Sequence, residues 1–286
     1  MYPPKFDYHR AHSVAEAITL LSQNEDAKLL AGGHSLLPTM KLRLAQPTAL
    51  IDIGRLPGIK GIRHEGNRIL IGALTTHAMV AAAEGLPAVL TEAAGGIGDP
   101  QVRNRGTVGG NVAHADPASD LPTVFTALHA RFHIAGAQGQ RVVEADDFFV
   151  DLFATDLADG EVLTAVEIGA EHAGTGSGYA KLFNPASRYA MVGAAAVVMV
   201  ENGTCTAASV AVGGLTPCAT RAASVEAALV GQPLNAETIA AAAQAVQNDL
   251  NLEELLGDIH ASAAYRYEMA PVFVKRALTK AAERAG

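Results

Sequence analysis

The chain of 286 residues contains 28 glycines, two cysteines and no tryptophan, and 49% of its residues are hydrophobic. This is the composition of a globular protein, and the length allows one large domain or two modest ones. The net charge of −8, with no run of like charge, argues against nucleic-acid binding, which needs a basic surface. Glycine makes up about a tenth of the chain, above the usual ~7%, so its placement is informative.

The chain carries no signal for membrane insertion or export. Its longest apolar run, about residues 193–200, is much shorter than the ~20 residues of a membrane-spanning helix. The N-terminal segment lacks the apolar core of a signal peptide, so we expect a cytoplasmic protein. Cys205 and Cys218 are too few for a disulfide scaffold or for a cysteine-ligated iron–sulfur cluster within this chain.

The N-terminal part of the chain mixes helix and strand signals. Ser13 precedes an apolar-periodic run and predicts a capped amphipathic helix. The elements expected next are a strand over 28–31, a strand over 49–53, a hairpin around 65–67, a helix from near Thr75 or Thr76, and a helix over 86–96 ended by Gly95 and Gly96. Residues 97–120 show little periodicity, and they predict a long irregular loop with a functional role.

The chain beyond this segment predicts a mainly β region and then helices. Strands are expected over 162–168, 179–183, 194–200 and 207–212, with a hairpin turn at 201–203. The last part, about 70 residues, has helical periodicity, and Asn235 is a plausible N-cap. We interpret the glycine-rich residues 173–178 as a junction, which gives domains over 1–176 and 177–286.

Two segments with adjacent glycines share one physical design: residues 31–35 (AGGHS) and residues 107–111 (TVGGN). Adjacent glycines can adopt positive φ, direct consecutive N–H groups into one concavity and let a ligand approach closely. Ser35, Thr107 and Asn111 would add side-chain donors. A lone glycine pair is more often a turn, but two such pairs predict binding of a diphosphate that bridges them, which favours a dinucleotide.

Other common site motifs are missing from the sequence. The Rossmann pattern of spaced glycines and the Gly-Lys-Ser/Thr of a Walker A loop do not occur. Ser35 does not lie in a Gly-x-Ser-x-Gly elbow. His114 and Asp116 are close in sequence, but a metal site would need further clustered ligands.

The two glycine segments, together with residues 114–120 (HADPASD), resemble the FAD-binding medium subunits of molybdenum hydroxylases, of the carbon monoxide dehydrogenase type within the xanthine dehydrogenase family. The resemblance extends over nearly the whole chain. It implies an α+β fold, in which a two-subdomain FAD-binding domain of the vanillyl-alcohol oxidase type is followed by a small α+β C-terminal domain.

The resemblance also implies a set of FAD-binding residues. Two segments would surround the pyrophosphate: Lys28, Leu29, Leu30, Ala31, Gly32, Gly33, His34 and Ser35, and Thr107, Val108, Gly109, Gly110 and Asn111. The other expected contacts are Asp116, Asp120, Leu163 on the adenine side, Lys181 near the flavin, and Tyr189 over one ring face. Helix capping by the two aspartates and core packing of Tyr189 are the alternative interpretations.

The function implied by the resemblance is that of an electron-transferring oxidoreductase subunit without a catalytic residue or metal of its own. A small partner with two-iron two-sulfur clusters and a large molybdopterin partner would complete a dimer of heterotrimers, a heterohexamer that could contact a membrane through its partners. FAD would pass electrons from those clusters to a quinone, NAD or oxygen. The alternatives are a self-sufficient oxidase of the vanillyl-alcohol oxidase type, with His34 placed for covalent flavin attachment, and a non-catalytic scaffold subunit.

Overall fold

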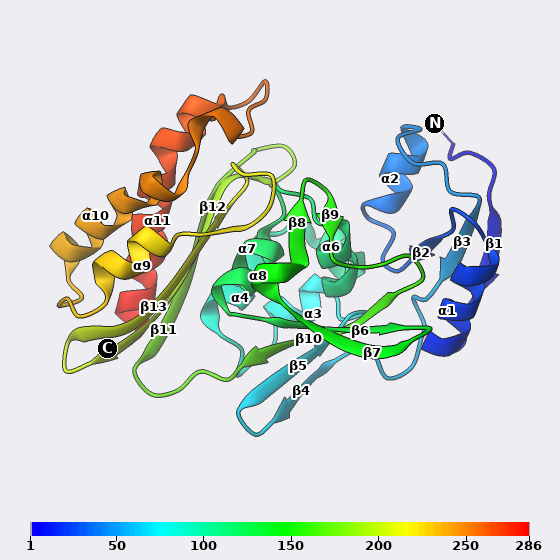
Figure 1. Ribbon diagram of the computed structural model, residues 1–286, viewed down its shortest axis with the longest axis horizontal. Coiled ribbons are helices and arrows are strands. Elements are labelled where there is room, and N and C mark those ends of the chain that lie inside the picture. Colours follow the sequence, from blue (N-terminus) through cyan, green and yellow to red (C-terminus); the bar gives the residue numbers. More distant parts are fainter. Residues whose placement is uncertain (1, 286) are drawn as a thin grey trace.

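The computed structural model describes residues 2–285, which form three lobes in chain order (Figure 1). The first lobe is a parallel three-stranded sheet of order β1-β3-β2, flanked by two helices. Its elements are β1 (Asp7–Arg10), α1 (Val14–Gln23), β2 (Lys28–Leu30), α2 (Leu36–Lys41) and β3 (Ala49–Asp52). Ser13 caps α1 as expected, because its Oγ accepts a hydrogen bond from the Glu16 N–H at 3.0 Å.

The second lobe is a five-stranded antiparallel sheet of order β4-β5-β10-β6-β7, with helices packed on one face (Figure 1). Its strands are β4 (Ile62–Glu65), β5 (Arg68–Gly72), β6 (Arg131–Gly136), β7 (Gly139–Glu144) and β10 (Val162–Gly169). Its other elements are α3 (His77–Ala81), α4 (Ala88–Gly96), α5 (Pro100–Arg105), α6 (Val108–His114), α7 (Asp120–Ala127), α8 (Ala145–Phe148) and the small hairpin of β8 (Phe149–Asp151) and β9 (Ala154–Thr155).

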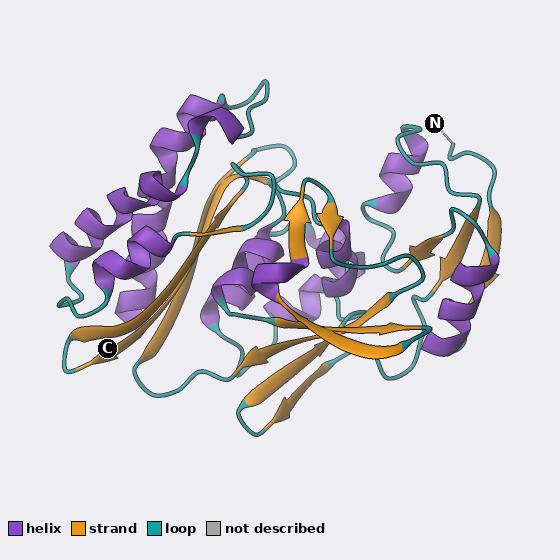
Figure 2. Ribbon diagram, viewed as in Figure 1, coloured by secondary structure: helices purple, strands orange, loops and turns teal. Residues whose placement is uncertain are grey.

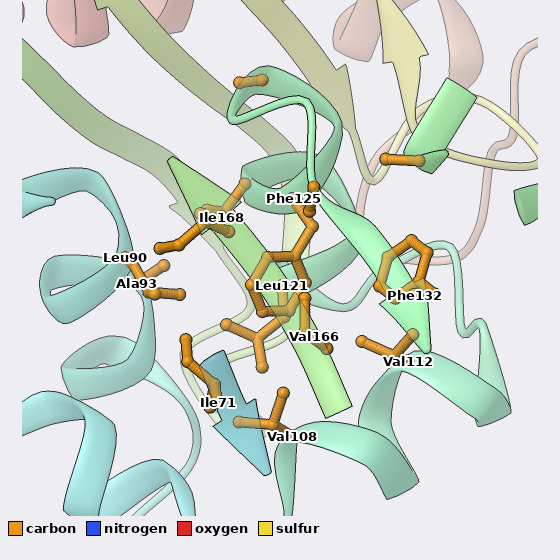
Figure 3. Packing of buried hydrophobic residues seen from close by; sticks show 14 of the residues in the cluster. Ile71, Leu90, Ala93, Val108, Val112, Leu121, Phe125, Phe132, Val166 and Ile168 are labelled. Atoms are coloured by element: carbon orange, nitrogen blue, oxygen red, sulfur yellow. The ribbon is translucent and has the colours of Figure 1, made fainter. Parts of the chain in front are cut away.

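The core of this lobe lies between the sheet and helices α4, α6 and α7 (Figure 3). Phe132 on β6 is fully buried, and its ring lies 4.2 Å from that of Phe148 and 6.0 Å from that of Phe125. Val108 and Val112 of α6 point into the same cluster. Burial of this face fixes α6 on the sheet and therefore fixes the second glycine segment.

The third lobe is a four-stranded sheet of order β11-β12-β13-β14, with helices on one face (Figure 2). Its elements are β11 (Thr175–Phe183), β12 (Ala190–Glu201), β13 (Thr204–Gly213), β14 (Thr220–Arg221), α9 (Ala223–Leu229), α10 (Ala236–Gln244), the short 3-10 helices Ala245–Asp249 and Leu252–Glu254, and α11 (Ala263–Ala285). The predicted turn at 201–203 and the predicted cap are confirmed. Asn202 and Gly203 have φ of 52° and 77°, and Asn235 forms a capping box.

The glycines of residues 173–178 serve close packing. A Cβ on Gly176 would lie 2.0 Å from the Ala281 carbonyl oxygen, and one on Gly178 would lie 2.7 Å from that of Ala277. Both glycines lie inside β11, so they let α11 approach the strand backbone. Most of this predicted junction is thus the start of β11, the first strand of the third lobe.

The expectation of a long irregular loop over 97–120 is wrong, because the segment contains α5 and α6. Asp99 caps α5 by accepting a hydrogen bond from the Val102 N–H at 2.8 Å, and Pro100 follows at the first position. Thr107 caps α6 through the Gly110 N–H at 3.2 Å. Helices of six and seven residues are too short to show periodicity, so their caps were the only available signal. None of the helices within residues 2–285 has the length and apolar character needed to cross a membrane.

Candidate functional site

The two glycine segments lie against each other in the structure. A Cβ on Gly32 would lie 2.1 Å from the carbonyl oxygen of Arg105 and 3.1 Å from Cα of Gly106. A Cβ on Gly110 would lie 3.8 Å from Cβ of Ala31. Gly32 therefore allows backbone-to-backbone contact between the turn after β2 and the turn between α5 and α6.

The first segment has free backbone donors. Gly33 has φ of 74°, which glycine adopts without strain. The backbone N–H groups of residues 32–35 donate to no acceptor among residues 2–285. The side chain of His34 is exposed, and its Nδ1 lies 3.1 Å from the Gly32 carbonyl oxygen. Consecutive free N–H groups around a positive-φ glycine can bind an anion, and binding of a diphosphate by this segment stays a prediction.

The second segment is not a concavity of this kind, and that part of the prediction is wrong. Neither Gly109 nor Gly110 has positive φ, because both lie in the first turn of α6. The N–H groups there are already used: Val108 donates to the Thr75 carbonyl at 2.9 Å and Gly109 to the Ala73 carbonyl at 2.8 Å. A Cβ on Gly109 would lie 2.5 Å from that of Ala73. The glycines here bring α6 close to the chain that follows β5.

Asn111, in the same helix, has an unsatisfied atom. Its Nδ2 donates to Ser119 Oγ at 2.9 Å, whereas its buried Oδ1 has no partner in the described chain. A buried acceptor without a donor costs about 1–3 kcal/mol, and protein atoms cover this oxygen, so it is a local cost of the packing between α6 and the start of α7. The N–H groups of residues 32–35 are therefore the donors here that fit the diphosphate of a dinucleotide.

Asp120 is the centre of a buried polar cluster. One carboxylate oxygen accepts a hydrogen bond from the Tyr179 hydroxyl at 2.5 Å, and the other accepts one from Lys181 Nζ at 2.8 Å. Asp120 is 4% exposed; burial raises its pKa, and the ammonium of Lys181 and the Tyr179 hydroxyl oppose that rise. Burial and the same carboxylate raise the pKa of Tyr179 well above its usual value. Ser119 is the N-cap residue of α7, so Asp120 is free for these contacts and does not act as a cap.

Family models match both parts of the chain. Residues 4–170 match the FAD-binding domain in molybdopterin dehydrogenase, and residues 177–281 match the C-terminal domain of the CO dehydrogenase flavoprotein. The chain belongs to the family of FAD-binding medium subunits of molybdenum hydroxylases. The expected order of a FAD-binding domain and a small C-terminal domain is therefore confirmed.

Named relatives cover nearly the full length of this medium subunit. The chain is 42% identical to the carbon monoxide dehydrogenase medium chain of Hydrogenophaga pseudoflava, over 98% of both chains. It is 38% identical to the alpha subunit of the 6-hydroxypseudooxynicotine dehydrogenase complex of Paenarthrobacter nicotinovorans, over 100% of this chain and 97% of the other. A solved structure of the Hydrogenophaga pseudoflava carbon monoxide dehydrogenase superposes with a TM-score of 0.95 at 43% identity and covers all of both chains.

The remaining predicted site residues of the medium subunit lie in four places. Asp116 lies in the loop before α7, where its Oδ1 accepts a hydrogen bond from the Ala118 N–H at 2.9 Å, and burial raises its pKa. Tyr189 is 43% exposed, and burial together with the charges of Asp116 and Asp120 raises its pKa. Leu163, on β10, is buried in the core of the second lobe. Residues 28–30 are strand β2, which leads into the first glycine segment.

Sequence reasoning missed Tyr179, Ser119 and the carbonyl of Arg105. The signal for Tyr179 was its spacing from Lys181, because residues two apart on a strand point to the same face. A cavity of about 360 Å³ adjoins this cluster and is lined in part by Gly96, Tyr179 and Lys181. Nothing local in the sequence identifies Ser119 or Arg105, whose roles depend on tertiary contacts.

Proposed function

We propose that this chain is the FAD-carrying electron-transfer subunit of a heterotrimeric molybdenum hydroxylase. The observation that carries the proposal is the backbone contact between the two glycine segments, with free N–H groups at residues 32–35. Bound FAD would supply reversible two-electron chemistry. The chain's own residues bind and orient the cofactor and set the charge around it.

The proposed binding residues divide by chemistry. The N–H groups of residues 32–35 bind the diphosphate, and residues 107–111 close the other side of the site. Lys28, Leu29 and Leu30 hold the first segment in place as β2. Asp116, Asp120, Lys181 and Tyr189 are proposed for the flavin end, where Tyr189 excludes water from one face. Leu163 supports the adenine side from within the core.

The proposed complex follows from what the chain contains. Cys205 is buried, and the chain has only one other cysteine, so a partner must supply the iron–sulfur clusters. No group of three or more potential metal ligands occurs among the described residues. We propose a small iron–sulfur partner and a large molybdopterin partner in a cytoplasmic dimer of heterotrimers, with any membrane contact made by the partners. We also propose the boundary between the two domains at residue 176.

The test is FAD binding by the purified chain. We expect about one noncovalent FAD per chain, and we expect that the Gly33→Val and Gly110→Val variants lose it. A Cβ at position 33 would require strained backbone and would lie 3.0 Å from the Leu37 side chain, and one at position 110 would lie 2.8 Å from Thr107 Oγ1. Gly169→Val is the matched control, because nothing lies within 4 Å of a Cβ there. Unimpaired binding by both site variants would refute the two-segment site.

The same preparation separates the alternatives. His34 is an exposed residue of the first segment, as covalent attachment in a self-sufficient oxidase would require. Acid precipitation releases noncovalent FAD into the supernatant, whereas flavin retained in the pellet would favour that oxidase. A preparation that stays colourless after FAD addition would favour a scaffold subunit.

A further inference from the structure

The hydroxyl of Tyr179 lies close to Gly193 of β12 and donates a hydrogen bond to Asp120 at the start of α7. Tyr179 and Lys181 lie two residues apart on β11, so both point toward Asp120 at the start of α7. Gly193 on β12 pairs with Lys181, and a Cβ there would lie 2.7 Å from the Tyr179 hydroxyl oxygen. A side chain at position 193 would displace the hydroxyl from the carboxylate, so the glycine preserves this hydrogen bond.

The contacts of Lys181 make Asp120 electrostatically important. Lys181 Nζ also donates to the carbonyl oxygens of Gly96 at 3.1 Å and Arg188 at 2.7 Å, and both of these acceptors are neutral. Within residues 2–285, Asp120 is the only carboxylate that forms a salt bridge with Lys181. The side chains of the pair are 5% and 9% exposed, so water screens their charges little. The local charge therefore depends on whether Asp120 is ionised.

The Tyr179 hydroxyl contributes to that ionisation. It is the partner of Oδ1, just as Lys181 is the partner of Oδ2. Without the hydroxyl, Oδ1 would be a buried carboxylate oxygen with no donor, and the neutral protonated form of Asp120 would be favoured. Glu92 contacts the backbone N–H of Tyr179, at 2.9 Å, so it does not replace the hydroxyl.

We propose that Tyr179 is a positioning residue, whose hydroxyl keeps Asp120 ionised against Lys181 and thereby fixes the charge of the protein beside the flavin. This inference rests on the proposed function, because it needs FAD at the end of the site where Asp120 and Lys181 lie. Tyr179 and Lys181 come from the third lobe and Asp120 from the second, so the docking of the two lobes sets this charge.

The test is the two-electron midpoint potential of FAD in the assembled, FAD-loaded complex, measured by spectroelectrochemistry. In Tyr179→Phe, Asp120 takes up a proton and Lys181 is left uncompensated, which favours the electron-rich reduced flavin. We expect the equilibrium constant for reduction to rise at least tenfold, or about 30 mV for two electrons. Asp120→Asn should shift the potential in the same direction. Tyr265→Phe is the matched control, because this tyrosine on α11 is 47% exposed and should leave the potential unchanged.

The double variant distinguishes positioning from a general structural role. If Tyr179 acts through Asp120, adding Tyr179→Phe to Asp120→Asn changes the potential no further. Additive shifts, or a Tyr179→Phe variant with one FAD and an unchanged potential, would overturn the inference. An unchanged potential in Asp120→Asn would also overturn it, even if Tyr179→Phe failed to fold. Absence of FAD from the wild-type complex would instead contradict the proposed function.

Discussion

Substitution of Gly32 by alanine tests the contact on which the site depends. A Cβ at this position would lie 2.1 Å from the Arg105 carbonyl oxygen and 2.9 Å from its carbon, and real Cβ contacts essentially never fall below 3.0 Å. The obstacle is backbone, so no side chain can rotate away. The turn after β2 and the turn between α5 and α6 must therefore separate by about 1 Å, a backbone shift of the kind that overpacking causes.

The magnitude follows from the cost of such strain. Overpacking of this kind costs about 1–3 kcal/mol. FAD would need both segments at their native spacing, so most of the cost would appear in binding. Because 1.4 kcal/mol corresponds to a tenfold change in Kd, we expect the affinity for FAD to fall roughly 5- to 150-fold.

The assay is a titration of the FAD-free chain with FAD, followed by flavin fluorescence, with thermal unfolding measured in parallel. Gly169→Ala is the control, because its Cβ would meet nothing within 4 Å and it tests glycine replacement alone. A Kd for Gly32→Ala within twofold of the wild-type value, in a folded protein, would refute the argument that this contact builds the site.

Two further substitutions test the fold that supports the site. Phe132→Ala should lower the free energy of unfolding by about 3–5 kcal/mol, because the ring is fully buried among three other phenylalanines. Urea denaturation measures this free energy, and a loss below about 1 kcal/mol would contradict the placement of Phe132 in the core. His77 is buried and uncharged, and burial lowers its pKa to about 4. Between pH 6.5 and about 4 the unfolded chain binds a proton that the folded chain does not, so stability falls as the pH falls through this window. His77→Gln should flatten that dependence in urea midpoints at pH 7.5, 6 and 5, and parallel curves for the two proteins would contradict it.

Local signals predicted much of the fold. The hairpin turn at Asn202 and Gly203 requires positive φ at both positions, which Asn and Gly adopt readily, so the turn is encoded in two residues. The caps at Ser13 and Asn235 likewise need only a side chain and the helix that follows it. Each of these features depends on neighbours in sequence, and each was predicted correctly.

The predictions that failed depend on contacts distant in sequence or on elements too short for periodicity. In sequence, Gly109 and Gly110 look like Gly32 and Gly33. In the structure, however, Gly109 and Gly110 begin a helix, whereas Gly32 and Gly33 lie in a turn. What separates them is tertiary: the N–H of Gly109 meets the Ala73 carbonyl, whereas the N–H groups of the first segment meet nothing in the described chain. A single sequence does not contain that difference, because it arises only when α6 packs on the sheet.

The two pairs therefore contribute to the candidate site in different ways. The first segment supplies donors, and its conformation would be sensitive to any residue with a Cβ at position 33. The second segment allows close packing, because Gly109 lets α6 contact Ala73. This contact positions Asn111, and the hydrogen bond from Asn111 to Ser119 positions the start of α7. Asp120 begins that helix and meets Lys181 from the third lobe. A substitution at Gly109 would thus change the position of residues at both ends of the proposed flavin site, although no atom of Gly109 needs to contact the cofactor.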